Sequence, residues 1–187
     1  TVKEEIQKAF EAIRNGGVIL YPTDTIWGLG CDPNNEQALE KLLAIKKRAK
    51  NKSLIVLVNN EGLLQRYVKE IPDVCFDLLD YAERPLTIVY PNGQYVSKLV
   101  LGLEKSIAIR LTKDEFCAQL IQKLKHGLIS TSANISNQAY SNKIEELPAD
   151  ITDNADYIVN LPLKNDKQPP SQIIKIGADS GVTIIRK

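Results

Sequence analysis

The sequence is poor in the residue types that support zinc, disulfide or serine–histidine chemistry. His126 is its single histidine, and Cys31, Cys75 and Cys117 are its three cysteines. Cysteines this far apart form no CxxC pair, which disfavours a zinc site or a disulfide framework and fits a reducing compartment. No nucleophile-elbow motif accompanies His126, whose place at the end of an expected helix is explained by capping and the helix dipole. We therefore expect a cytoplasmic protein without a serine–histidine mechanism.

The chain also lacks a charge excess and long apolar runs. Its formal net charge of +1 argues against a strongly basic nucleic-acid binder. No apolar run approaches the roughly 18 residues that a membrane helix needs, so no membrane association is expected. Charged residues near the first position, in a helical pattern, are unlike a secretory signal. With 187 residues and 43% hydrophobic content, we expect one domain over residues 1–187 and no C-terminal extension domain.

A polar turn follows the first expected strand. Residues 17–20 form a short apolar run, and Pro22 has no N–H, so ladder pairing is expected to stop there. Small polar side chains then cluster at 23–25, and Gly28 and Gly30 allow a sharp turn or a close approach. Ligands of open α/β sheets collect outside the carboxyl ends of strands. The stretch therefore indicates either part of a binding site or a solvated turn.

The remaining pattern predicts alternating helices and strands, which indicates an α/β fold. Expected helices contain residues 6–13, 35–47, 60–67, 72–79 and 114–125, and expected strands contain residues 54–58, 84–91, 106–111, 128–129 and 183–186.

Five cations lie within residues 46–53, at the end of the expected second helix. Cations favour a helix C-terminus, so a solvated helix end explains such a run. The alternative is a cradle for a polyanion, in which Lys supplies a point charge and Arg a planar fork.

Arg110 and a hydroxyl-rich segment each have a structural and a functional interpretation. Arg110 lies in a strand that places Ser106 and Ala108 on the same face. A buried Arg needs an anionic partner, which is either a protein carboxylate or a substrate carboxylate. Residues 130–136 are dense in Ser, Thr and Asn. Such residues form turns and caps, but their density also suits binding of phosphates or a nucleoside.

Taken together, these motifs resemble the YrdC-like family. The segments that carry the resemblance are YPTDTIWGLGCD at 21–32, the Lys-x-Arg pair at 46–48, AIR at 108–110 and STSAN at 130–134. They occur in the family's order and span nearly the whole chain. The resemblance implies an α/β domain with a twisted, open, mixed sheet, helices and a concave substrate-binding face.

The family activity, which the resemblance implies here, joins L-threonine, bicarbonate and ATP into threonylcarbamoyl-AMP and releases pyrophosphate. Partner proteins then transfer the threonylcarbamoyl group to a tRNA adenosine. The carbamate and the α-phosphate of ATP are both anionic, so the site must supply positive charge and positioning more than acid–base chemistry. Mg²⁺ is expected to bind through the phosphates of ATP, without a protein-held metal site.

The resemblance also implies roles for individual residues. Lys46 and Arg48 would grip the triphosphate as the catalytic cations, with Lys52 a weaker candidate. The other expected ATP-binding residues are Ser106, Ser132, Asn134, Tyr140 and Arg186. The expected L-threonine-binding residues are Thr25, Arg110, Ser130 and Ser171.

The sequence departs from the family pattern at several positions. Ala49 and Ser53 replace prolines, which loosens the loop between them, and Trp27 replaces a Tyr while keeping an aromatic wall. Asn137 replaces a Gly, and Gln172 replaces the Thr after Ser171. Residues 163–170 are polar and end in proline, so we expect a mobile flap over the site.

Two alternatives to the synthase remain open. One is a paralogue that keeps the fold without the activity, against which the intact Lys-x-Arg and STSAN segments argue. The other is an RNA-binding module that uses a basic concave face, with weak RNA binding also conceivable beside the synthase activity. Near-neutral net charge weakens it, because phosphate-dominated binding requires an excess of cations.

Overall fold

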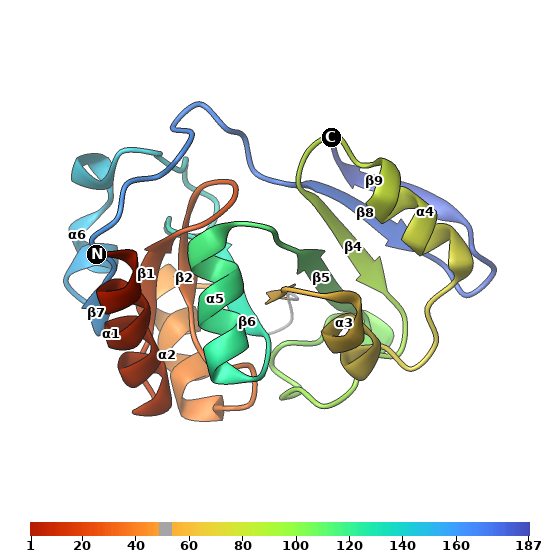
Figure 1. Cartoon of the computed structure of the whole chain (residues 1–187), viewed down its shortest axis with the longest axis horizontal. Coiled ribbons are helices and arrows are strands. Elements are labelled where there is room, and N and C mark those ends of the chain that lie inside the picture. The colour runs from red at the N-terminus through yellow and green to blue at the C-terminus, as the bar shows by residue number, and fades with distance from the viewer. Residues whose placement is uncertain (49–53) are drawn as a thin grey trace.

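A computed structural model describes residues 1–48 and 54–187 and shows a mixed α/β fold (Figure 1). Within these residues the strands form one nine-stranded sheet in the order β7-β1-β2-β6-β3-β5-β4-β8-β9, with parallel and antiparallel pairs. The twisted, open, mixed sheet that the sequence predicted is therefore confirmed.

All the predicted helices and strands are present, and four elements, α6, β2, β7 and β8, were not predicted. The helices are α1 (Val2–Arg14), α2 (Glu36–Lys46), α3 (Glu61–Tyr67), α4 (Asp73–Tyr81), α5 (Glu115–Leu124) and α6 (Ala149–Thr152), with 3-10 turns at Leu103–Lys105 and Ile144–Glu146. The strands are β1 (Ile19–Pro22), β2 (Trp27–Gly30), β3 (Ile55–Val58), β4 (Leu86–Tyr90), β5 (Ile107–Leu111), β6 (Leu128–Ser132), β7 (Tyr157–Ile158), β8 (Gln172–Ile176) and β9 (Val182–Arg186).

Side-chain caps define where α2 and α5 begin. Asn35 accepts a hydrogen bond from the Ala38 N–H at the start of α2, and Asp114 accepts one from the Cys117 N–H at the start of α5. Such caps satisfy backbone donors that have no partner within the helix. At its other end α5 is capped by Lys125 in the left-handed conformation, not by His126. The His126 ring instead lies 3.5 Å from Asp32, measured from Nε2 to Oδ2.

The expected loop after Pro22 is in part a strand, which corrects the sequence interpretation. Strand β1 continues to Pro22, which is in register with Trp27 in the antiparallel partner β2. The β2 glycines serve close packing. A Cβ at Gly30 would lie 2.4 Å from the Ile129 carbonyl oxygen on β6, closer than a side chain can approach. The reversal itself is confined to the residues between the two strands.

Two apolar clusters cover much of the sheet, whereas strand β9 is exposed along its length. On one face α1 and α5 lie side by side (Figure 1), and Ile13 and Leu120 pack with Tyr21 and Leu128 of the sheet. A second cluster, which includes Leu42 of α2, covers other parts of the sheet. All three cysteines are buried and form no disulfide. No helix in residues 1–48 or 54–187 is long and apolar enough to cross a membrane.

Candidate functional site

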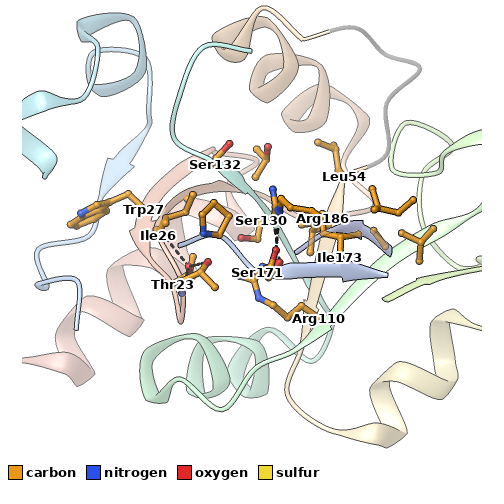
Figure 2. Close-up of a pocket in the computed structure, with 18 of the residues that line it drawn as sticks. Thr23, Ile26, Trp27, Leu54, Arg110, Ser130, Ser132, Ser171, Ile173 and Arg186 are labelled. Atoms are coloured by element: carbon orange, nitrogen blue, oxygen red, sulfur yellow. Dashed lines mark hydrogen bonds between the residues drawn. The ribbon is translucent and has the colours of Figure 1, made fainter. Parts of the chain in front are cut away.

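A cavity of about 220 Å³ opens beside the centre of the sheet. It is lined from segments far apart in the chain: the turn between β1 and β2, strands β5 and β6, and the region around β8 and β9 (Figure 2). The predicted site residues that line it are Thr25, Arg48, Arg110, Ser130, Ser132, Ser171 and Arg186. The fold thus brings together side chains from the four motifs with two residues, Ser171 and Arg186, from the last part of the chain.

Arg110 is buried against a carboxylate of the protein. Its side chain is 3% exposed, and its Nε and Nη2 both donate to Oδ1 of Asp24, at 3.1 and 2.9 Å. The sequence left open whether Arg110 pairs with a protein carboxylate or a substrate carboxylate, and the structure supplies the first. The remaining nitrogen, Nη1, lies 3.4 Å from Oγ of Ser171. One edge of the guanidinium is therefore held by Asp24 while the other is directed to the cavity lining.

Ser171 joins two arginines at the cavity. In the close-up it lies between Arg110 and Arg186 (Figure 2). Arg186 donates from Nε to the Ser171 carbonyl at 2.8 Å and from Nη2 to its Oγ at 3.3 Å. Arg186 is an exposed residue, but partial burial of its guanidinium and the neighbouring positive charge of Arg110 lower its pKa. Two like charges thus converge on one hydroxyl, an arrangement that favours an anion between them.

Lys46 is buried behind the hydroxyl-rich segment. Its side chain is 1% exposed, and Nζ donates to the carbonyl oxygens of Ser132 and Asn134 and, at 2.9 Å, to the Asn134 side-chain oxygen. Burial, together with the positive charge of Arg48, lowers the pKa of Lys46 to about 7. Lys46 therefore ties the end of α2 to the segment that follows β6.

A family model described as telomere recombination (Sua5, YciO, YrdC) matches residues 11–187. The chain belongs to the Sua5/YciO/YrdC family.

Relatives and solved structures agree with this membership. The chain is 39% identical to a threonylcarbamoyl-AMP synthase of Pseudoalteromonas translucida over 88% of its length and 89% of that protein. It is 36% identical to one of Idiomarina loihiensis over 82% of its length and 84% of that protein. The crystal structure of P. abyssi Sua5 complexed with L-threonine superposes with a TM-score of 0.84 at 24% identity, which shows the shared fold. That comparison covers 97% of this chain and 53% of the P. abyssi chain, so the chain spans about half of that relative.

In this member of the Sua5/YciO/YrdC family, Thr25 belongs to a hydroxyl-rich turn. The Thr25 N–H donates to Oγ1 of Thr23 at 3.0 Å, and that Oγ1 donates to the Ile26 carbonyl at 2.7 Å. The two threonine hydroxyls are 3.1 Å apart. These bonds fix a short turn at the edge of the cavity, and Thr23 lines the cavity with Thr25 although sequence reasoning did not assign it a role.

The other wall holds the residues expected to bind ATP. Ser132 donates from Oγ to Oδ1 of Asn134 at 2.6 Å, and the Asn134 side-chain nitrogen donates to the Gln138 carbonyl at 2.6 Å. Arg48 lines the cavity, and burial lowers its pKa. Hydrogen bonds of Lys46 to Ser132 and Asn134 therefore fix the side chains on this side of the cavity.

Four predicted residues lie outside the cavity lining: Lys46, Ser106, Asn134 and Tyr140. Lys46 and Asn134 are still bonded to Ser132, which does line it. Ser106 follows a 3-10 turn before β5, and its N–H donates to the Leu103 carbonyl. Tyr140 is 41% exposed in the segment after β6. The ligand roles of these four, like those of the residues that line the cavity, stay predictions.

The expected aromatic wall is not directed at the two arginines. Trp27 contributes to the lining, but its side chain is only 4% exposed and packs in the hydrophobic core. Its ring points away from Arg110 and Ser171 (Figure 2). Strand pairing explains this, because Trp27 is the first residue of β2 and not part of a loop.

The expected flap has contacts with the rest of the chain. Asn142 donates from its side-chain nitrogen to the carbonyls of Asp166 and Gln168, at 2.7 and 3.1 Å. The exposed Lys164 forms an ion pair at 3.4 Å with Asp114, whose side chain is only 7% exposed, and Pro170 lines the cavity. The predicted mobility of residues 163–170 is untested. Lys52, Ala49 and Ser53 lie outside the described residues.

The described residues offer no cluster of three or more His, Cys, Asp or Glu side chains that could hold a metal ion. Asp24 is already bonded to Arg110. The donors at the cavity are instead guanidinium groups and hydroxyls, which suit oxyanions. The residues present therefore do not fit a metal ion held by protein carboxylates.

Proposed function

We propose that this chain is an L-threonylcarbamoyl-AMP synthase, which converts L-threonine, bicarbonate and ATP into threonylcarbamoyl-AMP and pyrophosphate. The observation that carries the proposal is the set of three arginines, Arg48, Arg110 and Arg186, on one hydroxyl-lined cavity. The relatives named for this activity match most of the chain at 39% and 36% identity, which supports the same assignment.

The chemistry of this reaction requires such a site. The neutral threonine amine forms a carbamate, either with bicarbonate and loss of water or with carbon dioxide and loss of a proton. A carbamate oxygen then attacks the α-phosphorus of ATP. The bond from that phosphorus to the bridging oxygen breaks, and pyrophosphate leaves with the electron pair. Both reactants carry negative charge, so the barrier falls when fixed cations and hydrogen-bond donors hold them together. The reaction class is therefore nucleotidyl transfer.

Within the proposed function, the two walls of the cavity receive different substrates. On one side, Arg110 and the turn at Thr25 receive the amino acid, whose carboxylate suits the guanidinium edge that faces Ser171. Ser130 and Ser171 complete that side. On the other side, Arg48 and Ser132 receive the nucleotide.

The remaining nucleotide-binding roles are also proposals. Lys46 and Asn134 hold the nucleotide wall from behind, since both are bonded to Ser132. Arg186 lies at the junction of the two sides through its bonds to Ser171, and we assign it to the nucleotide. Ser106 and Tyr140 are candidates that would have to reach the nucleotide from outside the cavity lining.

Mg²⁺ enters this proposal as part of the substrate. Because the cavity offers guanidinium groups and hydroxyls, the ion is expected to arrive bound to the phosphate oxygens of ATP. The product is a mixed anhydride that proteins of tRNA modification would consume, and these proteins are the expected partners. A cytoplasmic location fits such substrates and stays a prediction.

The test is release of pyrophosphate by the purified protein with L-threonine, bicarbonate and ATP omitted in turn. We expect release only when all three are present. Release that does not depend on threonine would contradict the assignment. Absence of turnover with retained binding of ATP and threonine would favour a paralogue without the activity. RNA binding that falls steeply with salt, without any turnover, would favour an RNA-binding module.

A further inference from the structure

A buried hydroxyl on β4 contacts a residue of the cavity lining. Thr87 interrupts the apolar strand Leu86–Tyr90, and its side chain is 0% exposed. In the sheet it is in register with Arg110 on β5 and with Ile173 on β8. Its Oγ1 lies 2.7 Å from Oγ of Ser171, the residue just before β8. Thr87 therefore connects Arg110 with the serine that faces it.

Counting protons assigns the direction of this bond. Guanidinium groups can only donate hydrogen bonds, and a hydroxyl has one proton and two lone pairs. Arg110 and Arg186 both donate to the Ser171 Oγ, at 3.4 and 3.3 Å, and so use both lone pairs. The Ser171 proton is then directed to Thr87, which acts as the acceptor.

The bond to Thr87 is also the strongest contact of the Ser171 hydroxyl. Its length of 2.7 Å is the usual distance for O–H···O bonds, whereas the two arginine contacts are at the long end for N–H···O bonds. A carboxylate that enters the cavity can therefore attract the Nη1 group of Arg110 while Ser171 stays in place. Thr is suited to this task because its β-branched side chain is restricted at χ1, which fixes the hydroxyl.

We propose that Thr87 is a positioning residue for the carboxylate of the amino-acid substrate. Thr87 fixes the Ser171 hydroxyl, and this hydroxyl sets how Arg110 and Arg186 face the cavity. The inference rests on the proposed function, in which this side of the cavity binds L-threonine. Thr87 itself is not part of the cavity lining and touches no substrate.

The experiment compares Thr87→Val with Thr87→Ser in the full chain. Val keeps the shape of Thr but removes the acceptor, so the Ser171 proton loses its partner. We expect the KM and Kd for L-threonine to rise roughly fivefold to tenfold, the effect of one lost hydrogen bond. The KM for ATP should rise by less than that for threonine, because Arg186 keeps its 2.8 Å bond to the Ser171 carbonyl, and the kcat at saturating threonine should stay within about twofold. Thr87→Ser keeps a hydroxyl and should restore most of the threonine affinity.

Ile88→Val is the matched control, because Ile88 is the next residue of β4 and is also buried at 0% exposure. It should lower the melting temperature without changing the Kd for threonine. Thr87→Ala serves as a second variant without the hydroxyl should Thr87→Val fail to fold. Equal loss of ATP and threonine affinity in these variants would show a merely structural role and overturn the proposal.

Calorimetry on the unaltered protein distinguishes a failure of the Thr87 positioning role from a failure of the proposed synthase function. If it binds L-threonine and releases pyrophosphate while Thr87→Val binds threonine equally well, the positioning role is wrong and the proposed function stands. If the unaltered protein neither binds threonine nor releases pyrophosphate with all three substrates, the proposed function is wrong, and the role of Thr87 fails with it.

Discussion

Arg110 donates two hydrogen bonds to a single oxygen atom, Oδ1 of Asp24, from Nε at 3.1 Å and from Nη2 at 2.9 Å. The pair is largely buried, with side-chain exposures of 3% and 14%. A buried guanidinium without a carboxylate would be costly, so Asp24 makes a buried Arg110 possible. Because both bonds use one edge of the group, Nη1 remains directed to Ser171 and the cavity. Asp24 thus fixes an arginine that can still bind a substrate anion.

Asp24→Asn should weaken L-threonine binding roughly tenfold, because the amide keeps an oxygen acceptor but removes the charge that orients Arg110. The free energy of unfolding should fall by about 1–3 kcal/mol, since Arg110 is then buried without its counter-charge. Calorimetric titration with threonine and urea unfolding measure the two effects. Asp77→Asn, at an exposed position on α4, is the control and should change neither. Unchanged threonine affinity in Asp24→Asn would show that Arg110 keeps its orientation without the charge.

Arg110→Gln and Arg186→Gln should separate the two substrates, although both arginines contact Ser171. The first should weaken threonine binding by about tenfold or more and leave ATP affinity within about twofold, because it removes the fork assigned to the carboxylate. The second should weaken ATP binding and leave threonine affinity nearly unchanged. Titration of each variant with each ligand gives the comparison. If both variants lose the same ligand, the two arginines share one anion, and the assignment of Arg186 to the nucleotide is wrong.

Local signals in the sequence were sufficient for much of the fold. Asn35 and Asp114 are cap residues before amphipathic runs, and α2 and α5 begin directly after them. Strand β2 was missed because Gly28 and Gly30 are unfavourable in strands. The reason for Gly30 is tertiary, since a Cβ there would collide with the Ile129 carbonyl on β6. No local pattern predicts a contact between residues so far apart in the chain.

The same limit applies to the site. Thr25 and Ser132 belong to dense polar clusters after apolar runs, so the sequence could nominate them, and both line the cavity. Asp24 and Thr87 were not assigned roles, because their partners are 86 and 84 residues away. A single Thr in the apolar run Leu86–Tyr90 was the available signal, since a buried hydroxyl requires a hydrogen-bond partner.

Replacing residues 164–168 by a glycine–serine segment of equal length should lower kcat/KM by roughly tenfold, because the segment leads directly into Pro170 at the cavity. The melting temperature should fall by no more than about 2 °C, since Lys164 is largely exposed and the largely buried Asp114 side chain keeps its capping bond from the Cys117 N–H. Thermal unfolding and the pyrophosphate assay measure the two effects. Lys167→Ala, which changes one exposed side chain, should leave both unchanged. A large loss of stability in the replaced segment would show that it is structural and not a flap.

Lys46 should make the stability of the protein depend on pH. Burial and Arg48 lower its pKa from 10.5 to about 7, so between these values the unfolded chain binds a proton that the folded chain does not. The free energy of unfolding therefore rises with pH in this window, by up to about 1.4 kcal/mol per pH unit from this group. Below pH 7 both states are protonated, and the cost of burying the charge is fully present. Lys46→Met removes the titration, and urea unfolding of both proteins at pH 6.5, 7.5 and 8.5, taken as a difference, cancels the other titrating groups. We expect the unaltered protein to gain stability relative to Lys46→Met as pH rises. If the free energies of unfolding of the two proteins instead change in parallel with pH, the three oxygen acceptors around Nζ keep Lys46 charged.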